Sequence, residues 1–283
     1  MRKIYLVTPL RDEIINIKDL LSSISQSDYP IEAWVIVENN STDGSKEFLA
    51  NLQHVENVNK FVVLNRDDFS KSYQLGGKYS AIVNEGFKYI RENFEILDED
   101  LIGIVDADSF PSKSYYTALV KSFDSDPALG ITSGRAMILG SDHYSVHSKS
   151  WVMGSCRLWR YKCFNESGYI IGPSADTVSV ALAEIKGWKV YPENNVTFSA
   201  REVGKRVDFS YYGQSAYFRG NTFIYALVRS FKYFLKGNFR NSFMFLKGYT
   251  MSVLGDKAKI DNEEVRRYFS GYLLRAIKKK VFK

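Results

Sequence analysis

Short apolar runs alternate with helical patterns along the first part of the chain. The runs are rich in Ile, Val and Leu and end at polar turns, as buried strands do; they lie at 4–7, 33–37, 60–64 and 101–105. Between them apolar residues recur every three or four positions, which predicts helices at 13–24, 43–52 and 79–93. This order predicts an α/β fold with a mainly parallel sheet covered by helices on both faces.

The middle of the chain continues the pattern less regularly. It predicts helices at 111–124, 151–167 and 175–186, and strands at 130–139 and from 189 onwards. Beyond about residue 208 aromatic and basic helices follow without strands. We therefore expect an α/β domain over 1–207 and a helical extension over 208–283.

In open parallel sheets, ligands bind beyond the carboxyl ends of the strands. Asp106 and Asp108 stand there, directly after the buried run at 101–105. Two acids one residue apart repel each other, and hard carboxylate oxygens suit Mg2+ or Mn2+ held together with substrate phosphates. The pair therefore predicts a divalent metal site.

Two further segments carry candidate chemistry. In the loop 38–45, Ser41 or Thr42 is expected as a helix N-cap, while Glu38 and the neighbouring Asn side chains could hydrogen-bond a base and a ribose. Asp176 begins the helix at 175–186, where a carboxylate is favoured by the helix dipole. The same carboxylate could act as a general base toward an acceptor hydroxyl.

Charge is distributed unevenly along the chain. Residues 201–283 contain 18 Lys and Arg against 6 Asp and Glu, which leaves 20 basic and 26 acidic residues in 1–200. The acidic part suits a metal and the basic part suits phosphate-rich partners. The two cysteines match neither a metal motif nor a disulfide framework, which indicates a reducing cytoplasm. We expect neither a signal peptide at the start nor a membrane span.

The order of several segments resembles the family 2 glycosyltransferases of the GT-A fold over about residues 3–192. The segments are TPLRDE, VENNSTDGS, GKYSAIVNEGF, VDADSF, a Gly-Ser-Cys-Arg stretch and SADTVSVALAEIKGW. The resemblance implies a Rossmann-like, mainly parallel sheet and an inverting transfer of sugar from a UDP- or GDP-sugar to an acceptor hydroxyl on a glycan or a lipid-linked saccharide.

The resemblance also implies roles for individual residues. A nucleotide pocket would be lined by Thr8, Pro9, Leu10 and Glu13; Glu38 would contact the base and ribose with Asn40 close by, and Lys78 would approach the nucleotide. Asp106 would lie near the ribose and diphosphate, and Asp106 and Asp108 would hold Mg2+ or Mn2+. Asp176 would be the catalytic base.

The chain departs from the family pattern at four places. Glu38 stands where Asp is usual, Asp12 replaces Asn, and Ala175 replaces the Glu beside the base. The stretch VTFSAREVG offers no His to complete the metal site. The resemblance therefore implies either a metal held by Asp108, phosphate and water alone, or a metal that is weakly bound.

The C-terminal segment 217–255 mixes Phe, Tyr, Leu and Ile with Arg and Lys and contains no acid, and the chain closes with the basic stretch RAIKKKVFK. Such helices can lie on an anionic membrane surface, which would make the protein peripheral on the inner face of the cell membrane. Alternatively they pack over an acceptor cleft. No nucleic-acid motif accompanies these charges.

Three other function classes fit the sequence less well. A sugar nucleotidyltransferase would need a Gly-rich loop after the first strand, where TPLRDE has no glycine, and a dehydrogenase would need Gly-x-Gly-x-x-Gly at the same turn. A non-catalytic carbohydrate or lipid-surface binding protein would explain the 19 Tyr and 19 Phe. It would leave Asp106, Asp108 and Asp176 without a purpose.

Overall fold

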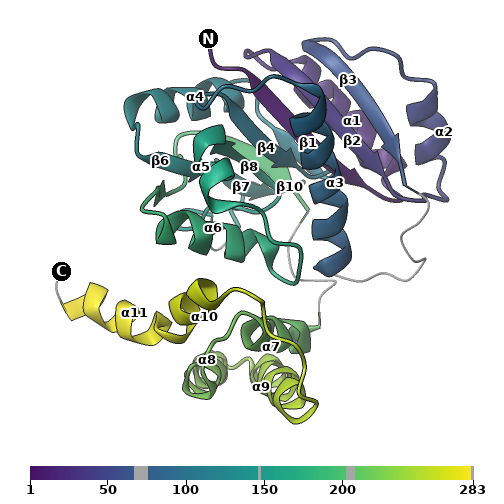
Figure 1. Ribbon diagram of the computed structural model, residues 1–283. Coiled ribbons are helices and arrows are strands. Elements are labelled where there is room, and N and C mark those ends of the chain that lie inside the picture. The colour runs from purple at the N-terminus through teal and green to yellow at the C-terminus, as the bar shows by residue number, and fades with distance from the viewer. Residues whose placement is uncertain (67–75, 146–147, 202–207, 282–283) are drawn as a thin grey trace. The chain divides into compact units, whose positions relative to one another are not determined.

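The computed structural model describes residues 1–66, 76–145, 148–201 and 208–281 (Figure 1). The chain forms two compact units, Met1–Glu202 and Val203–Lys283, and each is described by itself.

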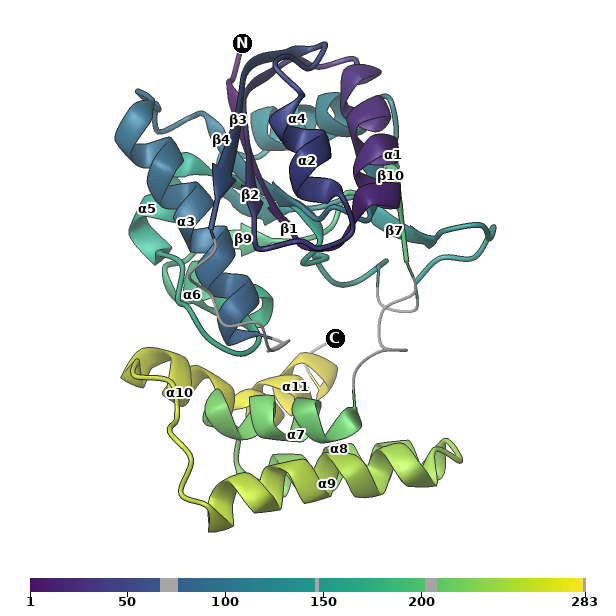
Figure 2. The ribbon, with the colours of Figure 1, turned by 90° about the vertical axis from the view of Figure 1, so that its right-hand side faces the viewer.

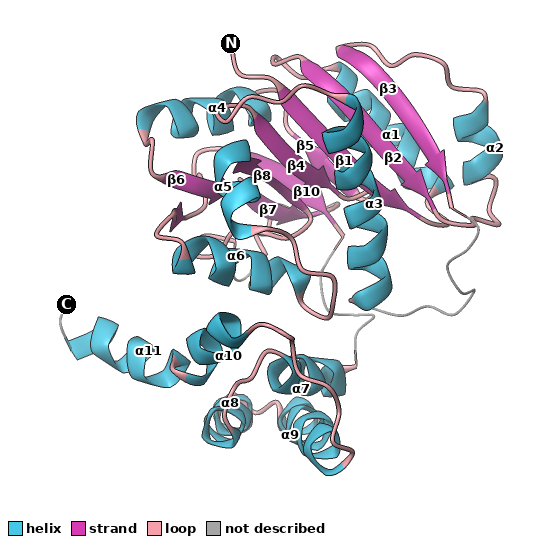
Figure 3. Cartoon of the chain, viewed as in Figure 1, coloured by secondary structure: helices cyan, strands magenta, loops and turns pink. Residues whose placement is uncertain are grey.

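A seven-stranded sheet forms the centre of the first unit (Figure 3). Its strands lie in the order β3 (Val58–Asn65), β2 (Ile31–Glu38), β1 (Ile4–Leu10), β4 (Leu101–Val105), β8 (Cys156–Arg160), β6 (Leu129–Thr132) and β9 (Lys189–Val190). Strands β3, β2, β1 and β4 are parallel, and β8 is antiparallel to both of its neighbours. The mainly parallel sheet confirms the predicted fold class.

Helices cover both faces of this sheet because the side chains of each strand alternate between two apolar clusters (Figure 2). On β1, Ile4 and Leu6 face the first cluster, and Tyr5 and Val7 face the second. The first cluster includes α1 (Ile14–Ser25), α2 (Ser45–Ala50) and α4 (Tyr115–Ser125). The second includes α3 (Gly77–Asn93), α5 (Tyr161–Ser167) and α6 (Ala175–Ile185).

A second, three-stranded sheet contains β5 (Ser109–Pro111), β10 (Thr197–Ala200) and β7 (Arg135–Ile138). The single strand predicted at 130–139 is therefore wrong: the chain leaves the large sheet after β6, turns at Ser133 and Gly134, and continues as β7 in the small sheet. The helix predicted at 111–124 begins only at Tyr115, because β5 precedes it.

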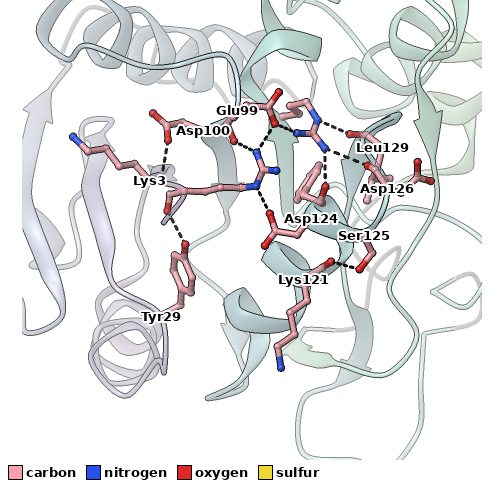
Figure 4. A network of polar contacts seen from close by, with 12 residues as sticks. Lys3, Tyr29, Glu99, Asp100, Lys121, Asp124, Ser125, Asp126 and Leu129 are labelled. Carbon is pink, nitrogen blue, oxygen red and sulfur yellow. Dashed lines mark hydrogen bonds and ion pairs between the residues drawn. The ribbon is translucent and has the colours of Figure 1, made fainter.

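The helix predicted at 151–167 is also wrong in its first half, where the structure has the strand β8 before the helix α5. All five residues of β8 are buried, including Arg157 and Arg160. Arg160 donates to the backbone oxygens of Phe123 and Leu129 and pairs with Glu99 (Figure 4). Charged residues are rare inside a buried strand unless they have partners, and Arg160 has them here in these backbone oxygens and Glu99.

The second unit consists, in its described part, of five helices: α7 (Phe209–Phe218), α8 (Phe223–Leu235), α9 (Phe239–Leu254), α10 (Glu263–Ser270) and α11 (Tyr272–Val281). Helices α7 and α9 approach closely at two glycines, since a Cβ at Gly213 would lie 2.0 Å from the Phe245 oxygen and one at Gly248 would lie 1.9 Å from the Ser210 oxygen. The side chains of 278–283, which include the last lysines of the predicted basic tail, lie outside the described residues. No helix in the described part of the chain combines the length and the hydropathy needed to cross a membrane.

Candidate active site

The carboxyl ends of four parallel strands meet at one edge of the large sheet. The register pairs Leu10 at the end of β1 with Glu38 at the end of β2, and Glu38 with Asn65 at the end of β3. Strand β4 lies on the other side of β1 and ends immediately before Asp106. The residues predicted to bind a nucleotide are thereby gathered at the edge where ligands bind in such sheets.

Thr8 and Leu10 build this edge from inside. The Thr8 hydroxyl donates to the Val105 oxygen at 2.7 Å and accepts from the Trp34 indole at 2.8 Å, so it fastens β1 to β4 and β2. Leu10 is buried in the first apolar cluster, whereas Pro9 is partly exposed. The side chains of Thr8 and Leu10 therefore shape the edge without offering polar groups to a ligand.

The loop after β2 is tied to the loop after β1. The Ser41 hydroxyl accepts from the Asp12 amide, Asp12 accepts from the Thr42 amide at 2.6 Å, and Asp43 accepts from the Ile14 amide at 2.9 Å. The N-cap predicted at Ser41 or Thr42 is wrong, because α2 begins after Gly44 without a side-chain cap. These side chains instead join the two loops.

Glu38 and Asn39 carry buried polar atoms without partners. Glu38 is fully buried, and its Oε1 accepts from the Ser41 amide at 2.6 Å. Its Oε2 and the Asn39 Oδ1 have no hydrogen-bond partner among the described residues. Asn40 follows in a left-handed conformation with φ 55°. Because unsatisfied buried acceptors are costly, Glu38 and Asn39 are suited to a ligand that brings donors. The sequence predicted hydrogen bonding by the Asn side chains of this loop, while the family resemblance named Asn40 alone.

Lys78 and Tyr79 lie in the first turn of α3, on the opposite side of β4 from α1. Burial lowers the pKa of Lys78, and the charge of Arg11 lowers it further. The Tyr79 hydroxyl donates to Asp106 Oδ1 at 2.6 Å. Tyr79 is a site residue that the sequence did not reveal, since an aromatic residue in an amphipathic helix looks like a core residue.

The acidic pair has different partners at its two members. Burial raises the pKa of Asp106 well above its ordinary value, the charge of Asp108 raises it further, and the Tyr79 hydrogen bond opposes the rise. Asp108 Oδ2 accepts a 2.6 Å hydrogen bond from the Nε of Arg201, which also pairs with Glu13. The sequence did not predict Arg201 as a site residue, because nothing near it in the sequence indicates that it meets Asp108.

The oxygens of this pair fit a divalent metal that arrives with a substrate. No three His, Cys, Asp or Glu side chains gather into a metal cluster in the described part of the chain. Mg2+ usually takes only one or two carboxylates and completes its shell with water and substrate phosphates. Asp106 and Asp108 match that requirement.

The segment 154–157 connects the acidic pair to Asp176 in the first turn of α6. The Asp106 amide donates to the Ser155 oxygen at 2.7 Å, and Arg157 donates to the Asp176 backbone oxygen at 3.0 Å. A Cβ at Gly154 would lie 3.1 Å from the Asp176 Cβ. Burial raises the pKa of Tyr169, and the charges of Asp176 and Asp106 raise it further. Both carboxylates therefore lie in the surroundings of the Tyr169 hydroxyl.

A separate hollow lies at the opposite end of β1 and is lined by Arg2, Tyr29, Asp100 and Asp124, among others. Arg2 pairs there with Glu99 and Asp124, both at 2.6 Å. The hollow contains none of the predicted site residues, since these follow the carboxyl ends of the strands.

A family model described as Glycosyl transferase family 2 matches residues 5–179. No curated protein sequence matches the chain. Among solved structures, S. aureus TarS is similar over 76% of this chain with a TM-score of 0.55 and 14% identity. The match spans only 39% of the length of that TarS chain.

Two other solved structures match more of their own length. TarS 1–349 is similar over 93% of this chain and 76% of its own, with a TM-score of 0.54 and 15% identity. Mannosyltransferase PcManGT from Pyrobaculum calidifontis, in complex with GDP-Man and Mn2+, is similar over 97% of this chain and 81% of its own, with a TM-score of 0.53 and 15% identity. At these identities the likeness shows a shared fold.

Proposed function

Because the chain belongs to glycosyl transferase family 2, we propose that it moves a sugar from a UDP- or GDP-sugar to an acceptor hydroxyl with inversion at the anomeric carbon. The observation that carries this proposal is the segment 154–157, which contacts both Asp106 at the carboxyl edge of the sheet and Asp176 in the first turn of α6. A base and a diphosphate site are the two elements that a single displacement needs.

The base and ribose of the donor lie at Glu38 and Asn39. Both residues present buried acceptor atoms that lack partners among the described residues, and a nucleobase N–H or a ribose hydroxyl supplies the missing donors. Pro9 and Asn40 border this place, and Lys78 supplies positive charge from the start of α3. The diphosphate then extends toward Asp106 and Asp108.

Asp108 and Asp106 would hold Mg2+ or Mn2+ together with the donor phosphates. When bound, the metal offsets charge that develops on the leaving diphosphate. Tyr79 keeps Asp106 oriented through its hydrogen bond to Oδ1, and Ser155 fixes the backbone at the same residue.

Asp176 acts as the general base. Its carboxylate takes the proton of the acceptor hydroxyl as that oxygen forms a bond to the anomeric carbon, and the bond to the diphosphate breaks with its electron pair on the nucleoside diphosphate. One attack from the opposite face inverts the configuration. Arg157 positions Asp176 by donating a hydrogen bond to the Asp176 backbone oxygen. Gly154 leaves space beside the Asp176 side chain.

The acceptor is a glycan or a lipid-linked saccharide at an anionic membrane surface, which the exposed face of α8 supports. Seven large apolar side chains on one side of this helix are exposed: Phe223, Ile224, Leu227, Val228, Phe231, Phe234 and Leu235. We call this set the α8 apolar face. Lys232 beside it and the following Lys236 and Arg240 are exposed as well.

An apolar face of this extent marks an interaction surface. Amphipathic helices with flanking cations insert their apolar side among acyl chains while the cations meet lipid phosphates. The segment 209–255 contains no acid that would oppose this attraction.

The proposed function is tested with the purified chain, Mn2+ and a panel of UDP- and GDP-sugars. A cognate nucleotide sugar raises the melting temperature by mass action. Wild type also releases nucleoside diphosphate from it, either by transfer of the sugar to an added acceptor or by hydrolysis. The Asp176→Asn variant keeps the thermal shift and loses the release with acceptor. Absence of any thermal shift across the panel would overturn the proposed donor class.

A further inference from the structure

Arg201 is brought to the acidic pair by strand register. Strands β5 and β10 are antiparallel, and Ala200 pairs with Ser109. The next residues outward are Asp108 on one strand and Arg201 on the other, so the ladder itself sets the arginine opposite the carboxylate.

The guanidinium of Arg201 joins two acids of the site. Its Nε donates to Asp108 Oδ2 at 2.6 Å, and its second branch pairs with Glu13 at the start of α1. The side chains of Arg201, Asp108 and Glu13 are 33%, 26% and 17% exposed. These ion pairs are therefore exposed enough for a ligand to reach them, and buried enough to contribute more interaction free energy than a fully exposed surface pair does.

A divalent metal at Asp108 would compete with this arginine. Both bind the same carboxylate, and two cations a few ångströms apart repel each other. Once released, a guanidinium offers several planar donors that suit a diphosphate, and the diphosphate brings the negative charge that a displaced cation needs.

On the basis of the proposed function, we propose that Arg201 neutralises Asp108 and Glu13 while the donor is absent, is displaced from Asp108 by the metal, and then binds the donor diphosphate. Arg201 thus makes metal and donor bind together: metal alone must break an ion pair, whereas metal with donor gives the arginine a new partner.

The test measures binding of Mn2+ alone and of UDP, without any transfer reaction. In Arg201→Gln, Mn2+ binds the donor-free protein about fivefold to tenfold more tightly than in wild type, the scale of one lost charge-assisted hydrogen bond. UDP at saturating Mn2+ binds about tenfold more weakly, because the diphosphate loses a cation. A purely structural arginine would not shift the two affinities in opposite directions.

Arg201→Lys keeps the charge without the fork and should give Mn2+ and UDP affinities between those of wild type and the Gln variant. Arg2→Gln is the matched control, because Arg2 also bridges two acids but at the opposite end of β1. It removes the same charge and should leave both affinities unchanged. Melting temperatures show whether each variant is folded, and the Lys variant carries the test if the Gln variant is not.

Unchanged or weaker Mn2+ binding in Arg201→Gln overturns the displacement, and unchanged UDP binding overturns the diphosphate contact. If neither wild type nor variant binds Mn2+, the inference fails, while sugar transfer is still judged by the donor panel.

Discussion

The hydroxyl of Tyr79 donates a 2.6 Å hydrogen bond to Oδ1 of Asp106. This bond links the first turn of α3 to the end of β4 and stabilises the ionised carboxylate. Burial and the neighbouring Asp108 act in the opposite direction, and together they leave the pKa of Asp106 well above its ordinary value. The fold therefore keeps an ionisable group where its charge is disfavoured, which is typical of functional sites.

Replacing Asp106 by Asn should stabilise the protein and abolish Mn2+-dependent UDP binding. A carboxyl whose pKa is raised on folding binds more protons in the folded state, so its contribution to stability falls as pH rises from the unfolded pKa through the raised folded pKa. Asn does not titrate, and we expect a gain at neutral pH of about 0.5–2 kcal/mol, as is common when a functional residue is replaced. Urea unfolding at several pH values measures it.

The matched control is Asp19→Asn, which makes the same chemical change at an exposed position on α1. Its stability should follow that of wild type across the pH range. A variant Asp106→Asn less stable than wild type at neutral pH would contradict the interpretation.

The sequence was sufficient for the parts of the fold that rest on apolar periodicity. The run 101–105 was predicted with the bounds that β4 has, and the helix 175–186 differs from α6 by one residue. Both are stretches in which burial and local propensity agree. The position of Asp106 and Asp108 at the carboxyl edge of the sheet could also be predicted, because the buried strand ends immediately before Asp106.

Other parts of the site depend on contacts that no local pattern encodes. The sequence did not predict strand β8, which contains the buried Arg157 and Arg160; both donate to backbone oxygens of residues that are distant in the sequence. Arg201 meets Asp108 through the register of β5 and β10, which are 86 residues apart between Pro111 and Thr197. Such pairings belong to tertiary structure, so the roles of these three arginines could not be predicted from local patterns.

Asp176→Asn should lower transfer by about 10²–10⁴-fold and leave donor affinity unchanged, because the change removes a general base and no donor contact. Transfer is measured by release of nucleoside diphosphate, and donor affinity by calorimetry. A variant that transfers at the wild-type rate would remove Asp176 from the mechanism.

Gly154→Ala should lower kcat by about threefold to tenfold, since small misplacements of a catalytic group are costly. The added Cβ would lie 3.1 Å from the Asp176 Cβ and 3.3 Å from its Oδ2, so the carboxylate must shift by a few tenths of an ångström. Donor affinity and melting temperature should stay close to wild type. Equal losses in kcat and donor affinity would indicate a general disturbance instead.

Glu38→Gln should weaken UDP binding by about tenfold, the scale of one hydrogen bond to a charged acceptor. The amide oxygen can still accept from the Ser41 amide, but the buried Oε2 is replaced by a donor. Inorganic pyrophosphate, which lacks a base and a ribose, is the internal control, and its Mn2+-dependent binding should be unchanged. Equal weakening of both ligands would place Glu38 away from the base and ribose.

Phe231→Asp should weaken binding to vesicles that contain phosphatidylglycerol by about tenfold, because an aromatic anchor is lost and a charge of the lipid's own sign is gained. Phe231 belongs to the α8 apolar face and is 59% exposed, and Leu97 in the first unit is 66% exposed. Leu97→Asp therefore makes a comparable change outside that face and should sediment with the vesicles as wild type does.

High salt should release wild type, and pure phosphatidylcholine should bind it weakly, since the flanking cations need anionic lipid. Equal vesicle binding by the two variants, together with slower transfer to a soluble acceptor in Phe231→Asp alone, would favour helices that cover the acceptor cleft over helices that lie on a membrane.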